Sequence, residues 1–174
     1  NAGTVDGTNY IGPTDNIPFN IRVNNLKAGT IDHLLFNTFF GYQAGNANTI
    51  GTNNTAHGYN VLYNNTTASR NTALGNYALY TQSFSNGGVA WNSNNVAVGY
   101  RALYSNQPTS TTNGYRNVAV GNDALYSNTT GYENTATGYQ ALSSNTAGYR
   151  NTATGYQALN SNTGNDNTAI GRQA

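Results

Sequence analysis

Short stretches whose side chains would alternate between two faces recur along most of the chain. In Asn95-Val96-Ala97-Val98-Gly99, the two valines would point to one face of an extended strand and Ala97 to the other. In the other copies of this stretch the first face carries mainly Thr, Val, Leu or Ile, and the second is nearly always Ala. The pattern predicts short β-strands whose small-residue face is pressed close to neighbouring backbone.

Each of these strands belongs to a nine-residue motif, Asn-[Thr/Val]-[Ala/Phe]-x-Gly-x-x-[Ala/Val]-[Leu/Gly], which is complete in residues 71–79. Eight copies begin at Asn37, Asn54, Asn71, Asn95, Asn117, Asn134, Asn151 and Asn167. Their central glycines are Gly41, Gly58, Gly75, Gly99, Gly121, Gly138, Gly155 and Gly171. Most neighbouring glycines have the same separation, so the repeat unit is about 17 residues long. The two longer separations, from Gly75 to Gly99 and from Gly99 to Gly121, mark insertions at Thr81–Asn94 and Ser105–Arg116, which we expect to be loops on one side.

A period this short cannot accommodate the helix pairs of helical solenoids, and a glycine in every copy disfavours helix. We therefore predict an all-β fold, a parallel β-roll or β-solenoid of about eight 17-residue rungs. Rungs spaced about 4.8 Å apart would form a rod on the order of 35–40 Å long.

Two motif positions have expected structural roles in such a stack. The first-position Asn would form a ladder in which each side-chain amide bonds to its equivalents above and below, although a ligand-binding row of Asn is an alternative. The central Gly suits a positive φ or a tight corner. The positions assigned to this structural repeat are Asn71, Gly75, Asn95, Gly99, Asn117, Gly121, Asn134, Gly138, Asn151 and Gly155.

Residues 1–36 lack the repeat and divide the chain into an N-terminal segment and a repeat domain at 37–174. Alternation over residues 17–24 predicts a strand, Asn24-Asn25 suits a two-residue turn, and residues 26–31 predict the returning strand. We expect a hairpin that caps the first rung, because a terminal rung exposes unpaired backbone groups.

A single rung of this repeat has few large apolar side chains, so its own interior buries little area. Three or more chains around a common axis would bury the remaining aliphatic and Tyr faces and limit exposed edges. The expected assembly is a homotrimer.

The repeats resemble a known family. Residues 95–99, 117–121 and 167–171 are similar to the Ser-Val-Ala-Ile-Gly core of YadA-like trimeric adhesin heads. That resemblance implies a left-handed parallel β-roll at the tip of a fibre, although those heads commonly use a shorter repeat. The longer pattern at 138–146 and 155–163 resembles repeat-rich tail-fibre domain proteins of Bacteroidetes and their phages, and residues 7–16 and 19–25 resemble the segment that precedes the repeats there.

The composition narrows the classes of partner. Charged residues make up only 7% of the chain, with seven Lys and Arg against six Asp and Glu, so nucleic acid and other polyanions are not expected partners. No apolar run approaches the roughly 20 residues of a membrane helix, so we expect no membrane insertion of this segment. There is no Cys for disulfides or thiolate metal sites, and because the chain starts at Asn1 without any Met we expect flanking sequence.

Catalytic motifs are not evident in the sequence. The two histidines, His33 and His57, lie in different contexts, and calcium-roll, phosphate-loop and nucleophile-elbow patterns are absent. Asp123 and Glu133 fall near arginines of neighbouring copies, which favours ion pairs between rungs over a paired-carboxylate site. We therefore expect no enzyme activity, no cofactor and no metal site.

The two insertions carry the candidate contact residues for a protein or glycan receptor, which are Phe84, Trp91, Gln107 and Tyr115. Phe84 and Trp91 would stack on sugar rings or dock a protein if exposed, but local packing is the favoured interpretation. The Thr-rich stretches 135–137 and 152–154 leave an ice-binding surface as a minor alternative.

Taken together, these features predict a structural fibre or adhesin segment, a trimeric β-roll head at a cell or virion surface that attaches to a receptor or glycan. The alternatives are a subunit of a self-assembling extracellular filament and a tail fibre of a phage or injection system, since fold does not fix function.

Overall fold

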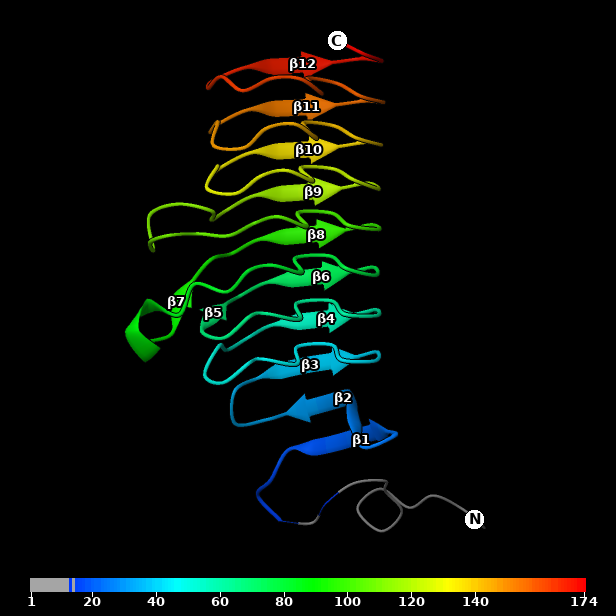
Figure 1. Cartoon of the computed structure of the whole chain (residues 1–174), viewed down its shortest axis with the longest axis vertical. Coiled ribbons are helices and arrows are strands. Elements are labelled where there is room, and N and C mark those ends of the chain that lie inside the picture. The colour runs from blue at the N-terminus through cyan, green and yellow to red at the C-terminus, as the bar shows by residue number, and fades with distance from the viewer. Residues whose placement is uncertain (1–12, 14) are drawn as a thin grey trace.

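A computed structural model describes residues 13 and 15–174, so part of the N-terminal resemblance, residues 7–12, lies outside the described residues. The fold is all-β and is dominated by one mostly parallel sheet of ten short strands (Figure 1). Within the described part, the only helical element is the 3-10 turn η1 at Asn86–Gly88.

The sheet begins with β1 (Phe19–Val23), β2 (Leu26–Asp32), β3 (Asn37–Phe40), β4 (Thr55–His57) and β6 (Thr72–Leu74). It continues with β8 (Val96–Val98), β9 (Val118–Val120), β10 (Thr135–Thr137), β11 (Thr152–Thr154) and β12 (Thr168–Ile170). A separate two-stranded sheet pairs β5 (Ala68–Ser69) with β7 (Trp91–Asn92).

An antiparallel hairpin leads into the parallel part of the sheet. β1 pairs with β2 through a turn at Asn24-Asn25, where both residues have positive φ, as type I′ turns require. β2 then pairs antiparallel with β3, and every later pairing in the large sheet is parallel. The hairpin therefore covers the backbone edge of β3 that no repeat covers.

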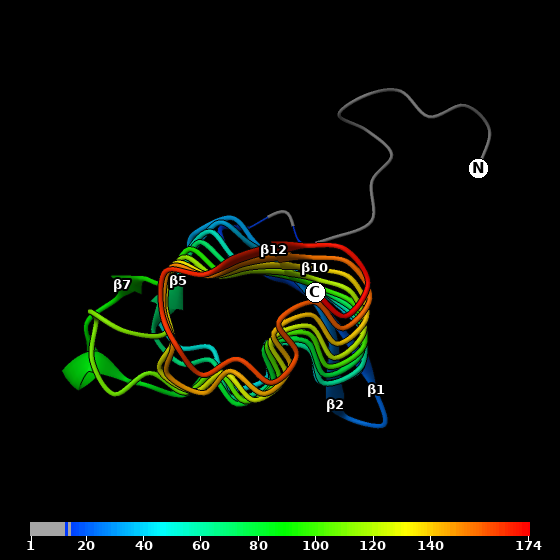
Figure 2. The ribbon, with the colours of Figure 1, turned by 90° about the horizontal axis from the view of Figure 1, so that it is seen from above.

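From β3 onward, each repeat lies on the previous one with like residues paired. Ala73 is the register partner of Ala97 in the adjacent strand, Ala97 is that of Ala119, and the same register holds along the sheet. We call each repeat a layer and number the layers one to eight by their first Asn, from Asn37 to Asn167. Seen along the stack, successive layers superpose closely (Figure 2).

The motif glycines form a column in which the backbones of adjacent layers touch. A Cβ added to Gly58 would lie 2.8 Å from the Gly75 carbonyl carbon, and one added to Gly138 would lie 2.7 Å from the Gly155 carbonyl carbon. These glycines also have φ between 124° and 142°, a region that L side chains rarely adopt. Contact and conformation thus both require glycine here.

The interior of the stack is filled by columns of small and aliphatic side chains. The motif Ala is buried in layers two to seven, as Ala97 is, and the Ala and Leu that follow the glycine are fully buried in layers three to six, as Ala102 and Leu103 are. The leucines adopt φ near 50°, which tightens the chain after the glycine corner. Layers one to seven therefore each contribute two residues at the alanine positions, and usually one leucine, to a continuous core.

A ladder of the motif asparagines lies beside this core, and it contains part of the predicted amide-to-amide bonding together with bonds to backbone groups. The Oδ1 of each Asn accepts the backbone N–H of the next layer's Asn, for example Asn134 N to Asn117 Oδ1 at 3.1 Å. The Nδ2 group usually donates to a carbonyl across its own layer, as Asn117 does to Gly131 O at 2.8 Å. Direct amide-to-amide bonds join four of the seven neighbouring pairs, whereas the bond from Oδ1 to backbone N–H is present in all seven, so the main role of the Asn is to satisfy buried backbone groups.

A second polar ladder runs parallel to the first. Asn145 Nδ2 donates to Asn128 Oδ1 at 3.0 Å, and Asn128 Nδ2 donates to Asn106 Oδ1 at 3.1 Å. In layer three, Gln82 occupies this column and bridges Asn65 and Asn106. The members of this ladder are Asn48, Asn65, Gln82, Asn106, Asn128 and Asn145.

Candidate functional surfaces

The outer face of the large sheet carries two columns of side chains that no part of the described chain covers. Residues beside the buried motif Ala, such as Val96 and Val98, point to this face. The exposed apolar members include Phe40, Leu74, Val120 and Ile170, of which Ile170 is 75% exposed. Layers four and five place Val at both positions and layers six and seven place Thr at both, so the face is aliphatic in its centre and threonine-rich in the two layers that follow.

Both insertions protrude on the same side of the stack, the side of β5 and β7 (Figure 2). They touch one another where Gln107 Nε2 donates to Ser83 Oγ at 3.2 Å. A hollow of about 480 Å³ is lined by Asn92 and Asn94 from the first insertion and by Thr111, Thr112 and Tyr115 from the second, together with Arg70 and Arg116.

The four predicted contact residues have different surroundings. Trp91 is only 6% exposed, packs edge-on against Phe84 with ring centroids 5.8 Å apart, and lies in strand β7. This agrees with local packing, the interpretation favoured from the sequence, and leaves little of the Trp91 ring free for the alternative of a ligand contact. Gln107 is exposed, while Tyr115 stacks on Tyr132 at 5.3 Å and borders the hollow between the insertions.

Parts of the first insertion are structural rather than free loop. Gln82 and Ser93 are buried and hydrogen-bonded to each other, with Gln82 Nε2 3.3 Å from Ser93 Oγ. Ser93 Oγ also donates to Asn71 Oδ1 at 2.7 Å. Only the tip between these two residues projects from the stack.

The charged residues form ion pairs between equivalent positions of adjacent layers. Arg101 lies 2.9 Å from Asp123, Arg116 lies 3.0 Å from Glu133, and Arg150 lies 3.3 Å from Asp166. The last two pairs belong to one column in which positive and negative residues alternate. The prediction of ion pairs between rungs is confirmed.

The histidines have no shared site. His33 Nε2 is hydrogen-bonded to Asn16 Oδ1, whereas the His57 ring stacks on Phe40 with centroids 6.2 Å apart. In the part of the chain that the structure describes, no three His, Cys, Asp or Glu residues are grouped so as to hold a metal. Over the same residues, no helix has the length and apolar character needed to cross a bilayer.

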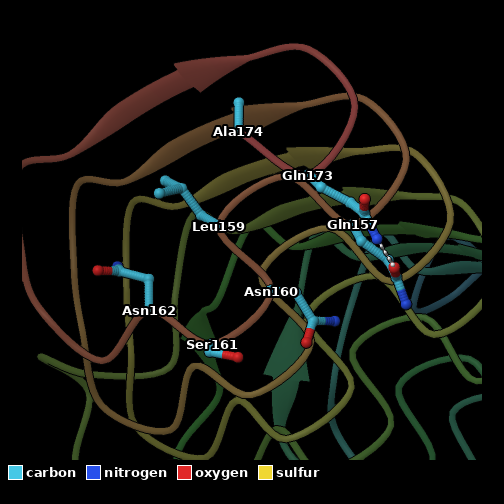
Figure 3. Close-up of a pocket in the computed structure, with 7 residues that line it drawn as sticks. All are labelled: Gln157, Leu159, Asn160, Ser161, Asn162, Gln173 and Ala174. Carbon is cyan, nitrogen blue, oxygen red and sulfur yellow. Dashed lines mark hydrogen bonds between the residues drawn. The ribbon is translucent and has the colours of Figure 1, made fainter.

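A hollow of about 520 Å³ opens on the terminal layer (Figure 3). Leu159 borders it and is half-buried, whereas its equivalent Leu142 is fully covered by the layer above. Beside it, Gln173 Nε2 donates to Gln157 Oε1 at 3.1 Å, so the amide column continues to the last layer. The hollow is thus lined by residues of the stack interior and of the amide column, and it is not a separate binding site.

The sequence analysis missed a cluster of tyrosines around Arg101. Tyr77, Tyr100, Arg101, Tyr104 and Tyr126 line a hollow of about 270 Å³ in layers three to five. The signal was present in the aligned repeats, because the residue two after the motif glycine is an amide in the other five layers but Tyr77, Arg101 and Asp123 in these three. Comparisons with known protein families, with curated proteins and with solved structures found no match to this chain.

Proposed function

We propose that this chain is a non-enzymatic structural segment of a fibre or adhesin, a trimeric β-solenoid that holds attachment surfaces in fixed positions. The observation that carries the proposal is the in-register stacking of its layers, with alanine, leucine and asparagine columns running along the whole repeat domain. Such a stack is a stiff scaffold, because each layer contacts its neighbours through both side chains and backbone.

The outer face of the large sheet is the surface we assign to trimer contacts. Its central layers carry Leu74, Val96, Val98, Val118 and Val120 without any charged residue, which suits burial against another chain. The core of a single layer is mostly alanine and one leucine, so burial of this face would add substantially to the hydrophobic stabilisation. Two further copies around a three-fold axis would cover it in each chain.

The resemblance to YadA-like heads supplies the left hand of the roll and the position at a cell or virion surface. In this proposal the antiparallel hairpin β1–β2 acts as a cap that keeps the first layer from pairing with other strands. The insertions and other irregular surfaces of the repeat domain then present contacts to a receptor or glycan.

The assembly can be tested with a charge placed on the proposed contact face. The double variant Val98→Lys/Val120→Lys puts two cations per chain on this face, and sedimentation equilibrium should show a shift from trimer to monomer. Ser144→Lys adds a cation at an exposed site off the face and should keep the wild-type mass. If the double variant keeps the wild-type mass, the outer face is not the contact surface.

The attachment role can be tested by removing the tip of the first insertion. Deletion of residues 85–90 keeps Gln82, Ser93 and their buried hydrogen bonds, so the layers should still fold. Beads coated with this variant should adhere less to cultured epithelial cells than beads coated with the wild type. Unchanged adhesion together with altered assembly would contradict the receptor role of the insertion and leave the stack as a spacer.

An alternative proposal is a subunit of a filament that grows end to end. In such a filament, a strand of the next chain would pair with the edge of β12 opposite β11, its partner in the described chain. Electron micrographs of the purified chain distinguish the two functions, since a filament subunit would give long fibres and an attachment head would give discrete particles.

A further inference from the structure

The repeat is least regular in layers three to five at the corner that follows the motif glycine. Two positions after the glycine, the other layers have an amide, and in layers six to eight these amides bond to one another, as Gln157 does to Gln140 at 2.7 Å. Tyr77, Arg101 and Asp123 interrupt this amide column in three consecutive layers. Departures from an otherwise consistent repeat are where functional residues are expected.

The column one residue earlier changes in the same layers. It contains tyrosines that stack in pairs, Tyr42 on Tyr59 and Tyr139 on Tyr156. In layers three and five this position is Asn, so Tyr100 has no aromatic neighbour above or below it in the column. Tyr100 is 44% exposed, and its ring borders the hollow of about 270 Å³.

Arg101 is fixed within this hollow. Its Nε lies 2.9 Å from Asp123 Oδ1, and its Nη2 donates to Asp123 Oδ2 at 3.2 Å. Its guanidinium carbon lies 4.8 Å from the Tyr100 ring centroid and 5.0 Å from that of Tyr126. The guanidinium is thus oriented by one carboxylate and two rings, while the N–H groups of Nη1 are left to donate to a ligand.

Tyr77 lines one edge of the hollow, at a position where five of the other layers carry an amide. Its ring meets those of Tyr59 and Tyr80 edge-on, with centroids 5.3 and 5.6 Å away, whereas Tyr80, Tyr104 and Tyr126 stack face to face. Burial, followed by the neighbouring tyrosines, raises the pKa of Tyr77 and of Tyr104 above the ordinary value. The phenols are therefore neutral at physiological pH and act as hydrogen-bonding groups.

We propose that this hollow, the tyrosine hollow, binds one pyranose ring of a neutral carbohydrate. Aromatic faces accept the apolar face of a sugar, and the phenol and guanidinium groups bond its hydroxyls. The volume is just below the range of about 300–1,000 Å³ that is usual for ligand pockets, which suits a single ring. Arg101 disfavours cationic ligands, and its pairing with Asp123 leaves no net charge to select an anion.

This inference rests on the proposed attachment function and gives that function a ligand class and a location. None of the residues that line the tyrosine hollow belongs to either insertion, and Tyr104 lies directly before the second insertion. A stack that anchors to a glycan through the tyrosine hollow would leave the insertions free for other contacts.

Saturation-transfer NMR with the whole chain tests the proposal. The probes are the methyl pyranosides of glucose, galactose, mannose and N-acetylglucosamine, and we expect at least one to bind with a Kd of about 1 mM. Tyr100→Ala should weaken that binding roughly tenfold, because it removes an aromatic face. Tyr139→Ala is the matched control, since Tyr139 has the same column position and is 43% exposed but does not line the hollow.

A second variant covers the case in which an alanine disturbs the fold. Tyr77→Gln restores the residue that layers six and seven carry at this position, so it should fold as the wild type does and still lose binding. The proposal is overturned if no pyranoside gives saturation transfer, if Tyr100→Ala and Tyr139→Ala weaken binding equally, or if tetramethylammonium binds in place of the sugars. Sedimentation mass measured on the same samples separates these results from failure of the trimer proposal.

Discussion

Replacement of Asn117 by Ala probes the buried asparagine ladder in the middle of the stack. Asn117 Oδ1 accepts the backbone N–H of Asn134 at 3.1 Å and its Nδ2 at 3.2 Å, while Asn117 Nδ2 donates to Gly131 O at 2.8 Å. Alanine removes all three bonds. Asn134 Nδ2 keeps Gly148 O, and Gly131 O keeps Asn128 Nδ2, so the one group left without a partner is the Asn134 N–H.

The cost follows from this single orphaned donor. A buried N–H without an acceptor costs about 1–3 kcal/mol, and loss of the remaining net hydrogen bonding adds about 1 kcal/mol. We expect Asn117→Ala to lower the free energy of unfolding by about 3 kcal/mol. With a urea m-value of about 2 kcal/mol/M, the midpoint measured by circular dichroism should fall by about 1.5 M.

Asn122→Ala is the control in the same layer. Asn122 is exposed and accepts the backbone N–H of Tyr100 at 3.1 Å, so water replaces its oxygen when the side chain is removed. It should cost less than about 1 kcal/mol. Equal effects of the two substitutions, or a loss below about 1 kcal/mol for Asn117→Ala, would refute the argument that the ladder satisfies buried backbone groups.

Three further predictions, two substitutions and one pH dependence, concern other columns of the stack. Gly121→Ala places a Cβ 2.6 Å from the Gly138 carbonyl carbon and should lower the urea midpoint strongly. Gly87→Ala is the control, because its Cβ meets nothing within 4 Å. Similar midpoints for the two variants would contradict close contact of the layers. Glu133→Arg would place a cation between Arg116 and Arg150, which gives three cations in succession, and should lower Tm in low salt with partial recovery in about 0.5 M NaCl. A salt-independent change would argue against electrostatics. Because the pKa of Tyr77 and of Tyr104 is raised, these tyrosines ionise first in the unfolded chain as pH rises above about 10, so their contribution to stability is fully present below that pH and is lost above it. The stability of Tyr77→Gln should fall less steeply above that pH, and an equal slope would count against the tyrosine contribution.

The repeat and its alternation predicted the all-β architecture because the same residue recurs at each structurally equivalent position. The period in the glycines from Gly41 to Gly171 gave the layer length, and the alternation around Ala97 gave the buried face. The turn at Asn24-Asn25 was equally accessible, since two consecutive asparagines tolerate positive φ.

Features that depend on backbone conformation were not accessible in the same way. Leu103 and its equivalents adopt φ near 50°, although leucine has no intrinsic preference for that region. Packing in the core outweighs the local cost, which residue preferences alone do not reveal. The second polar ladder was missed although its members lie seven residues after the motif glycine in each layer, because Gln82 replaces the Asn in layer three.

The candidate surfaces were only partly predictable. The insertions were located from spacing, but the burial of Trp91 depends on pairing of β7 with β5, which no local pattern indicated. The tyrosine hollow brings together Tyr77, Tyr100 and Tyr126 from three layers, and it becomes visible in the sequence only when the repeats are compared column by column.

The proposal that two further copies cover the outer face of the sheet is tested most directly by the mass of the native particle. The chain has a mass of 18.4 kDa. Sedimentation equilibrium of the wild-type chain should give about three times that value, independent of concentration over the micromolar range. A single species at 18.4 kDa would contradict the trimeric assembly and leave the apolar columns around Val98 and Val120 without the partner proposed for them.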